Sequence, residues 1–515
     1  MMCVTCSNCG FVNSLLPPNP SSDDLVSELL RGSRPLLDVD RAFIDAEITK
    51  LKRLKAWYDD QLQEIQLRQL TVLRELENRE SIYAPIRRLP RDILIEIFHW
   101  VSDTWSLDAV TEDDDLEEVD SLDVNGPLWV LARVCGLWRD TLHASPASWA
   151  SYVNVKPPFP KHTREILQTY LERTGDHPLS LVVICEGTDL TKEGQIMSLV
   201  VQCHHRWKDV CISIDMHHTH YLESISHLPV LQAIEIDFTD VINHDYEYRS
   251  DICLKAPQLR QATFANQGIH LVRLPLTVTH YSGYLPCVDD FPFLSQLPRL
   301  RTCHLAFSRL LPGSMPEAPV VMGEFCQLYV GDLKVLNFLT APMVQSLTLS
   351  AITGPQSLSS ITLFFRRSRC RLESFSMSMD ILKSEPSASI REIFSSEACT
   401  TISHLKLELS SISHNVANAL ASLSILPNLH HLCLCFNEKL HPHTEAERLA
   451  LLDMIRSRCK AGLLKTIEVQ FDVEESRDIE ADIRALIGGD LEMREEIWSP
   501  LHSDHLRFFW ESITA

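Results

Sequence analysis

A short phrase that recurs from about residue 178 onward constrains the fold more than any other feature of the sequence. The phrase is Pro-x-Leu, then two residues, an apolar residue, any residue and a second apolar residue. In the first clear copy, Pro229 and Leu231 are followed by Ile234 and Ile236. Apolar residues at alternate positions predict a short strand with one buried face. Other clear copies begin at Pro298, Pro342 and Pro427, and weaker copies begin at Pro257, Leu372, Ile402 and Leu464.

The spacing of these copies predicts a repeating α/β architecture. They recur at intervals of roughly 27 to 45 residues, and helical stretches such as 444–459 lie between them. Strand, loop and helix in alternation are typical of a leucine-rich-repeat-like solenoid whose strands form one parallel sheet. The Asn that usually follows the strand is absent, so the repeats are irregular. A doubly wound sheet is the alternative, but no Gly-rich turn follows any strand. We expect the solenoid to span 153–515.

Residues 38–82 contain neither Gly nor Pro and predict one long amphipathic helix, placed at 37–84. Its apolar residues follow the four–three spacing of a coiled coil, and Lys55 and Gln69 occupy two seam positions. The helix either packs back on its own chain or pairs with another helix, and the polar seam residues weaken a free dimer. The apolar seam residues are Ile44, Ile48, Leu51, Tyr58, Leu62, Ile65, Val72 and Leu76.

The segment before this helix, residues 1–36, is rich in Ser, Pro and Asn, and we interpret it as a flexible tail. Cys3, Cys6 and Cys9 lie three residues apart within it. Three thiolates at this spacing could contribute to a zinc site, but a structural site needs a fourth ligand and none is nearby. We therefore expect ordinary thiols and no metal.

Two short apolar segments follow the long helix. In the first, Pro90 suits the first turn of a helix, and Ile93, Leu94, Ile97 and Phe98 lie on one apolar face. A helical hairpin of this size cannot bury so much apolar surface alone, so it must pack on the rest of the chain or on a partner. In the second segment the equivalent apolar residues are Leu131, Val134, Cys135, Trp138 and Leu142, before Ser145-Pro146 ends the helix and Trp149 follows.

These segments resemble the F-box. The matching motif is Leu89-Pro90-x-x-Ile93-Leu94-x-x-Ile97-Phe98, then Val134-Cys135-x-x-Trp138-Arg139, then Ser145-Pro146-x-x-Trp149. The chain is most similar to the F-box proteins of mushroom-forming (basidiomycete) fungi, and the resemblance places an all-α F-box at 85–152. It implies a non-catalytic subunit that docks a Skp-family adaptor and, through it, a cullin-based ubiquitin ligase. Some motif residues must pack on one another, Ile97 and Val134 being the candidates. The implied adaptor-binding residues are Leu89, Pro90, Ile93, Leu94, Ile97, Phe98, Val134, Cys135 and Trp138.

An insertion at 103–126 separates the two halves of the motif and departs from the shorter spacer that is common in F-boxes. Ten of its residues are Asp or Glu and none is Lys or Arg. Dense like charge with few large apolar residues predicts a solvated, disordered loop over 105–124. The alternative is that the acidic run at 112–120 attracts a basic partner.

Composition excludes several classes of function. The net charge of −22 disfavours nonspecific nucleic-acid binding, which needs a basic surface, and it disfavours anionic membranes. No run of about 20 apolar residues is present, so we expect no transmembrane helix. The 16 cysteines lie mostly singly in apolar segments, as Cys303 does. This is typical of reduced cysteine in the cytosol or nucleus.

No constellation of catalytic or cofactor-binding residues is apparent. The sequence lacks GxGxxG, GxxxxGK[ST], HExxH and GxSxG. Two His at alternate strand positions could share a metal, but no carboxylate or Cys completes a recognisable pattern, and we expect surface or loop histidines. Cys211 and Cys435 are expected to be packing residues. The histidine clusters are His204-His205, His217-His218-x-His220 and His441-x-His443.

The sequence therefore favours a substrate-recognition subunit of a Skp–cullin–F-box ubiquitin ligase in the cytoplasm, the nucleus or both. The F-box docks the adaptor, and the solenoid binds an unknown protein substrate and holds its lysines near the charged E2. We expect no cofactor and no metal. One alternative is a repeat scaffold whose F-box acts outside a ligase, and another is an enzyme hidden in the repeats.

Overall fold

The structure is a computed structural model with two compact units, residues 1–90 and 91–515. It describes residues 3–5, 12–14, 20–107, 120–239, 249–264, 271–284, 291–306, 319–350, 358–382, 386–409, 414–436, 445–462, 464–471, 483–484 and 492–497. Within these residues, no helix combines the length and the apolar character that a membrane span requires. The two units are described separately below.

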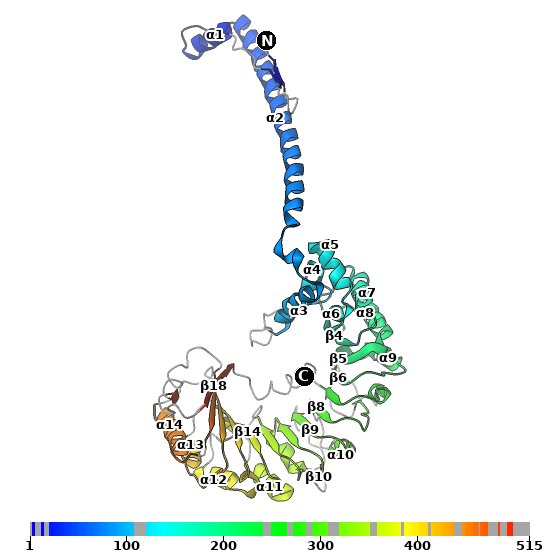
Figure 1. The fold of residues 1–515 in the computed structure, drawn as a ribbon, viewed down its shortest axis with the longest axis vertical. Coiled ribbons are helices and arrows are strands. Elements are labelled where there is room, and N and C mark those ends of the chain that lie inside the picture. Colours follow the sequence, from blue (N-terminus) through cyan, green and yellow to red (C-terminus); the bar gives the residue numbers. More distant parts are fainter. Residues whose placement is uncertain are drawn as a thin grey trace. The chain divides into compact units, whose positions relative to one another are not determined.

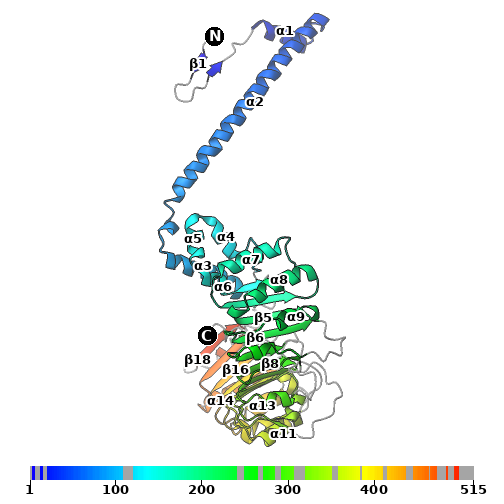
Figure 2. The same cartoon turned by 90° about the vertical axis from the view of Figure 1, so that its right-hand side faces the viewer.

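The first unit is dominated by one long helix. Helix α2, Asp38–Ser81, has 44 residues without a break, as Figure 2 shows. The Asp40 carboxylate accepts the N–H of Leu37 at 3.3 Å and pairs with the guanidinium of Arg34 at 2.9 Å, which fixes where the helix begins. The other elements of this unit are β1 Cys3–Thr5, β2 Val12–Ser14, α1 Pro20–Leu30 and the short 3-10 helix Pro85–Arg88.

The segment interpreted above as a flexible tail therefore contains regular structure. Strands β1 and β2 pair in antiparallel fashion, with Cys3 opposite Ser14. Helix α1 begins at a proline and carries two aspartates early, Asp23 and Asp24, both of which favour a helix start. Of the three spaced cysteines, Cys6 and Cys9 lie outside the described residues.

The second unit begins with a small helical bundle. Its helices are α3 Arg91–Leu107, α4 Pro127–Val134, α5 Gly136–His143 and α6 Pro146–Ala150. Proline occupies the start of α4 and of α6, where its missing N–H costs nothing. The single helix expected over the second apolar segment is wrong, because Cys135 is fully extended at φ −160° and separates α4 from α5. Periodicity could not detect this break, since apolar residues continue on both sides of it.

The acidic insertion is shorter than the sequence indicated. Helix α3 continues to Leu107, and residues 120–126 form a turn that packs on the solenoid. Ser121 donates its N–H to the carbonyl of Asn154 at 2.8 Å, and Leu122 is buried. The expectation of disorder is therefore wrong for 120–124, and residues 108–119 lie outside the described part of the chain.

A 14-stranded sheet forms the rest of the second unit, and every strand in it is parallel to its neighbours. Its order is β18-β17-β16-β15-β14-β13-β11-β9-β8-β7-β6-β5-β4-β3. The expected α/β class and parallel sheet are thus confirmed. The strands are β3 Val153–Val155, β4 Leu179–Cys185, β5 Trp207–Asp215, β6 Ala233–Thr239, β7 Gln261–Phe264, β8 His280–Tyr284, β9 Thr302–Ala306, β11 Gln327–Val330, β13 Ser346–Leu349, β14 Ser374–Ser378, β15 His404–Leu409, β16 His431–Phe436, β17 Thr466–Phe471 and β18 Glu492–Ile497.

The apolar residues of the repeated phrase stack in register along this sheet. Leu347 lies beside Leu328 on one neighbouring strand and beside Phe375 on the other. The second apolar position forms a parallel column, in which Leu349 lies beside Val330 and Met377. These side chains are buried, so the two columns form the continuous core of the solenoid.

Helices cover one side of this sheet, and the stack curves with its strands on the inner side (Figure 1). Arg458 of α14 is buried and donates to the carbonyls of Leu420 and Ile425 at 2.7 Å, which satisfies backbone groups of the preceding repeat. The main outer helices are α7 Thr163–Arg173, α8 Leu190–Gln202, α9 Thr219–Glu223, α10 Phe291–Ser295, α11 Leu358–Ser368, α12 Ser387–Phe394, α13 His414–Leu420 and α14 Glu445–Lys460. A pair of two-residue strands, β10 Val320–Val321 and β12 Leu339–Thr340, and short 3-10 turns complete the repeats.

Candidate functional site

Helix α3 carries two apolar stripes that face in different directions. Leu94 and Phe98 are fully buried in the bundle. Ile93 is 44% exposed and Ile97 half-buried, and Trp100 continues their spacing with 71% exposure. Residues at i, i+4 and i+7 share one side of a helix, so these three form an outward stripe. Leu94 and Phe98 support this surface from within and do not form it.

The second half of the motif also divides into inner and outer residues. Val134, one of the two candidates for an internal residue, is 55% exposed, and Val130 is exposed one turn before it, so Val134 lies at the surface. Cys135 and Trp138 are half-buried. The Trp138 ring packs on Phe98, with centroids 5.1 Å apart, and so it joins α5 to α3. Among the other motif residues, Leu89 is half-buried and Pro90 is exposed.

An aromatic cluster joins the bundle to the first repeat of the solenoid. The ring of Trp149 on α6 lies 5.7 Å from Trp129 on α4 and 5.1 Å from Tyr170 on α7. The Arg173 guanidinium lies over both indoles, at 4.4 Å and 4.6 Å from their centroids. Burial lowers the pKa of Arg173 and raises that of Tyr170 to about 12. This aromatic joint couples the two parts of the unit.

A hydrogen-bonded pair next to this joint was missed by sequence inspection because Asn154 and Ser121 are far apart in the chain. The N–H of Asn154 donates to the Ser121 hydroxyl at 3.0 Å, and the reverse contact joins the Ser121 N–H to the Asn154 carbonyl at 2.8 Å. Both residues are buried. The turn after the acidic run is thus held on the first strand of the sheet.

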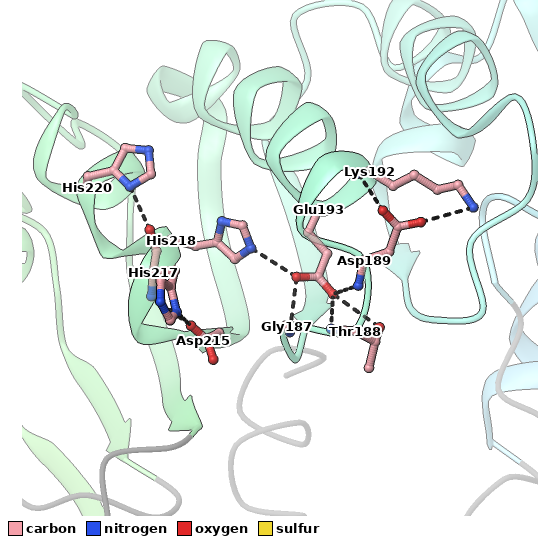
Figure 3. Close-up of polar contacts among 9 residues, drawn as sticks. All are labelled: Gly187, Thr188, Asp189, Lys192, Glu193, Asp215, His217, His218 and His220. Atoms are coloured by element: carbon pink, nitrogen blue, oxygen red, sulfur yellow. Dashed lines mark hydrogen bonds and ion pairs between the residues drawn. The ribbon is translucent and has the colours of Figure 1, made fainter. Parts of the chain in front are cut away.

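The histidines of the cluster 217–220 do not converge (Figure 3). His218 is buried and its Nε2 lies 2.9 Å from Glu193. His217 pairs instead with Asp215, and the Nδ1 of His220 lies 2.8 Å from the carbonyl of His217. Across the described part of the chain, no three His, Cys, Asp or Glu side chains are grouped so that they could hold a metal. His441 and His443 lie outside that part.

Glu193 of α8 is the centre of this polar network. Its carboxylate accepts the N–H of Gly187 and of Thr188 at 3.0 Å and that of Asp189 at 3.2 Å, in addition to the contact with His218. The side chain is fully buried. The network therefore fastens the turn after β4 to the turn after β5, which is a structural role.

Gly187 is required by the same turn. Its φ is +81°, and a Cβ there would lie 3.1 Å from the Asp215 carboxylate. Burial acts to raise the pKa of Asp215, but hydrogen bonds from the backbone and the ring of His217 outweigh it, so the pKa is lowered. The carboxylate is thus held ionised against the close backbone of Gly187.

The sheet face opposite the helices carries the strand residues between the buried columns. Its residues alternate with the buried columns, so Glu235 lies beside Cys211 and Thr263 on neighbouring strands. Burial first, and the nearby charge of Asp237 second, raise the pKa of Glu235 to about 7. This face presents side chains of neighbouring repeats side by side, which suits recognition of an extended partner.

Cysteines at the far end of this face pack against each other. Cys433 and Cys435 on β16 are buried, with sulfurs 3.7 Å apart. The hydrogen bond with Cys435 and burial raise the pKa of Cys433, which keeps its thiol protonated and unreactive. Cys211 is half-buried.

Comparisons with known proteins add little to this geometry. No protein-family model matches the chain, and no curated protein matches it significantly. Among solved structures, the chain is similar to the leucine-rich repeat-containing protein LegL7 from Legionella pneumophila, over 59% of this chain and 97% of that chain, with 14% sequence identity and a TM-score of 0.34. The repeat architecture rests on the strand register described above.

Proposed function

We propose that this chain is the substrate-recognition subunit of a Skp–cullin–F-box ubiquitin ligase. The helical bundle docks a Skp-family adaptor, which links it to a cullin, and the sheet face of the solenoid binds a protein substrate. The chain works in the cytoplasm or the nucleus and contributes position, with no bond-making step of its own.

The outward apolar stripe on α3 carries the proposal. The inner stripe, Leu94 and Phe98, already fills the bundle, so the outer one is not needed to complete the core. Ile93 and Ile97 belong to the motif that resembles the F-box and remain partly open, as does Val134 after α4. Apolar side chains left open on a small helical surface are typical of a protein interface.

The aromatic joint supports the same function. A ligase raises the rate of transfer by holding a substrate lysine near the E2, and this gain needs a fixed geometry. The buried Trp149 and Tyr170 and the half-buried Trp129 and Arg173 connect the proposed adaptor-binding helices to the first repeat. A bound substrate is thus kept at a defined place relative to the adaptor.

Adaptor binding by a double variant tests the proposal. Ile93→Asp with Val134→Asp puts two charges on the outward surface without touching the buried stripe. We expect a folded protein that loses a recombinant Skp-family adaptor in calorimetry, since each buried aliphatic side chain contributes about 1.5–3 kcal/mol to an interface. Leu276→Asp, at an exposed leucine of the solenoid, is the matched control and keeps the affinity.

Two outcomes separate the proposal from its alternatives. Unchanged adaptor affinity in the folded double variant would remove the α3 surface from the interface. Adaptor capture without any cullin in affinity purification from cells would instead identify a scaffold that acts outside a ligase. Substrate ubiquitination that requires both the adaptor and the cullin supports the proposed function.

A further inference from the structure

Helix α2 carries a heptad seam whose apolar side chains are mostly exposed. Leu51 and Leu62 are 59% and 56% exposed, and Ile48, Ile65 and Val72 are exposed as well. The seam runs through the helix with the four–three spacing of a two-stranded coiled coil. Two polar residues interrupt it, Lys55 and Gln69, and such residues set the orientation and register of a coiled coil.

We propose that α2 pairs with α2 of a second copy of this chain in an antiparallel coiled coil, whose centre lies between Ala56 and Trp57. In an antiparallel pair, the first seam position of each heptad faces the fourth position of the other helix. The central layers then join Leu51 to Leu62 and Lys55 to Tyr58, each twice. The outer layers join Ile48 to Ile65 and Ile44 to Gln69.

The charges that flank the seam select this register. With the centre at 56–57, Glu47 faces Arg68 of the second copy, and Lys52 faces Asp59 of the second copy. Each pair occurs twice. The one like-charged pair in this register, Asp40 with Glu75, lies near the helix ends, where Arg34 already pairs with Asp40 at 2.9 Å. Opposite charges at the flanking positions determine which partner and orientation a coiled coil adopts.

The neighbouring antiparallel registers are worse. Shifting the contact by one heptad toward the C-terminus of one helix would place Asp59 opposite Asp59 of the second copy and Glu47 opposite Glu75. Shifting the contact by one heptad in the other direction would place Lys52 opposite Lys52 of the second copy and Asp45 opposite Asp59. Like charges that face each other at close range disfavour both arrangements.

A parallel pair is disfavoured at the seam itself. It would place Lys55 against Lys55 of the second copy inside the apolar interface, and it would bring Glu75 onto Glu80 at the flank. In the antiparallel pair, the Lys55 stem lies along an apolar residue and its ammonium reaches the aromatic ring of Tyr58.

The arrangement has a consequence for the assembled molecule. At 1.5 Å of rise per residue, the two C-terminal ends of α2 lie roughly 75 Å apart. Two copies of the following unit would thus leave the coiled coil from opposite ends. The inference does not depend on the ligase function, because it rests on α2 alone.

A charge exchange in the full-length protein tests both the pairing and its direction. The molar mass by light scattering should correspond to two chains. Lys52→Glu should weaken the dimer by about tenfold or more in dissociation constant, because two attractions become two repulsions. Adding Asp59→Lys should restore it, and Arg53→Glu, the same charge change on the side away from the seam, should leave it unchanged.

The parallel arrangement gives the opposite rescue, because Lys52 would then face Glu47 of the second copy. Restoration by Glu47→Lys and not by Asp59→Lys would overturn the proposal, as would a mass of one chain or of more than two chains. A photo-cross-linking residue at position 51 provides an independent readout. Cross-links that map near Leu62 support the antiparallel pair, and cross-links near position 51 overturn it.

Discussion

The buried Glu193 carboxylate shows how one side chain can hold two repeats together. One oxygen accepts the N–H groups of Thr188 and Asp189, and the other accepts that of Gly187 and contacts His218, so an amide can replace only one of the two oxygens. Glu193→Gln keeps one oxygen as an acceptor but turns an NH2 group toward the N–H of Gly187 and leaves that donor unsatisfied. We expect the free energy of unfolding to fall by about 2 kcal/mol or more. Urea denaturation measures this, with Glu165→Gln at an exposed position of α7 as the control.

If Glu193→Gln and Glu165→Gln unfolded at the same urea concentration, the carboxylate network would not contribute to stability. Hydrogen exchange adds a local readout. The amide of Gly187 should lose protection in the Gln variant, whereas Thr188 and Asp189 can still donate to the remaining amide oxygen.

Glu235 makes the stability of the solenoid depend on pH. Its pKa in the folded chain is raised from 4.5 to about 7, mainly by burial, so the folded state holds the proton longer than the unfolded state does. The unfolded state therefore binds fewer protons between these two values, and the stability contributed by Glu235 is lost as pH rises through that window. The loss is complete above the folded pKa.

Glu235→Gln should abolish this dependence. The variant carries no titratable proton at the position, so its free energy of unfolding should change less than that of the natural chain between pH 5 and pH 8. It should also be the more stable protein at pH 8. Denaturation series at the two pH values measure both quantities, and Glu172→Gln on the exposed side of α7 should keep the natural profile. Identical pH profiles for Glu235→Gln and the natural chain would contradict the assignment.

At the scale of the element, α3 separates a structural stripe from an open one. Leu94 is fully buried and Ile93, its neighbour in sequence, is 44% exposed. We expect Leu94→Ala to cost about 2–5 kcal/mol, because it removes core volume and leaves a cavity. Ile93→Ala should cost much less. Thermal unfolding of the two variants compares them directly, and equal losses would mean that both stripes are internal.

Two variants at neighbouring positions of strand β13 test the repeat by the same kind of comparison. Leu347 is buried in the core column, and Thr348 points to the opposite face. Leu347→Asp places a carboxylate among apolar side chains, which costs several kcal/mol unless the group stays protonated. Because each repeat is stabilised by its neighbours, hydrogen-exchange protection should fall first in β11, β13 and β14. Thr348→Asp is the control and should leave these strands protected.

A uniform loss of protection throughout the second unit would instead indicate one cooperative domain. No loss in either variant would mean that the column of Leu347 is not a core element. The protection of α3 in the bundle should be retained, since it is held by its own buried contacts.

At the scale of the whole molecule, much of the fold could be predicted from the repeated Pro-x-Leu phrase. The strands that this phrase does not identify were missed for a physical reason. The strands that begin near residues 153, 207, 280 and 327 follow the same spacing, but their leading apolar residue is not Leu. Each leading residue is nevertheless buried, because that position needs an apolar side chain and the neighbouring repeats adjust to its size. A search for Pro and Leu therefore misses them. The leading residues are Ala150, Trp207, Val278 and Phe325.

The contacts of the site could not be predicted in the same way. Periodicity identified the apolar residues of α3 but not which of two adjacent stripes faces inward, since both have helical spacing. The break at Cys135 depends on one extended residue between two helices. Glu193 and His218 are 25 residues apart and meet only because their turns follow adjacent strands. Such contacts are set by the packing of repeats and leave no local signal.

The joint between the bundle and the solenoid determines whether the two parts of the second unit unfold together. Trp149 is fully buried between Trp129 and Tyr170, and Arg173 covers both indoles. Trp149→Ala removes the centre of this cluster and should cost about 3–5 kcal/mol at the joint. We expect the bundle of the variant to melt separately from the solenoid in calorimetry, and we expect one transition for the two in the natural chain. Arg164→Ala, on the exposed side of α7, is the control.

The same variant separates binding from transfer if the proposed function holds. The outward residues Ile93 and Val134 are unchanged in Trp149→Ala, so at a temperature where the bundle remains folded the adaptor should still bind. The substrate is no longer held at a fixed place relative to the adaptor, and the effective concentration of its lysines at the E2 falls. We therefore expect slower ubiquitination at unchanged substrate affinity. A single melting transition together with undiminished ubiquitination in Trp149→Ala would show that the aromatic cluster does not couple the two parts.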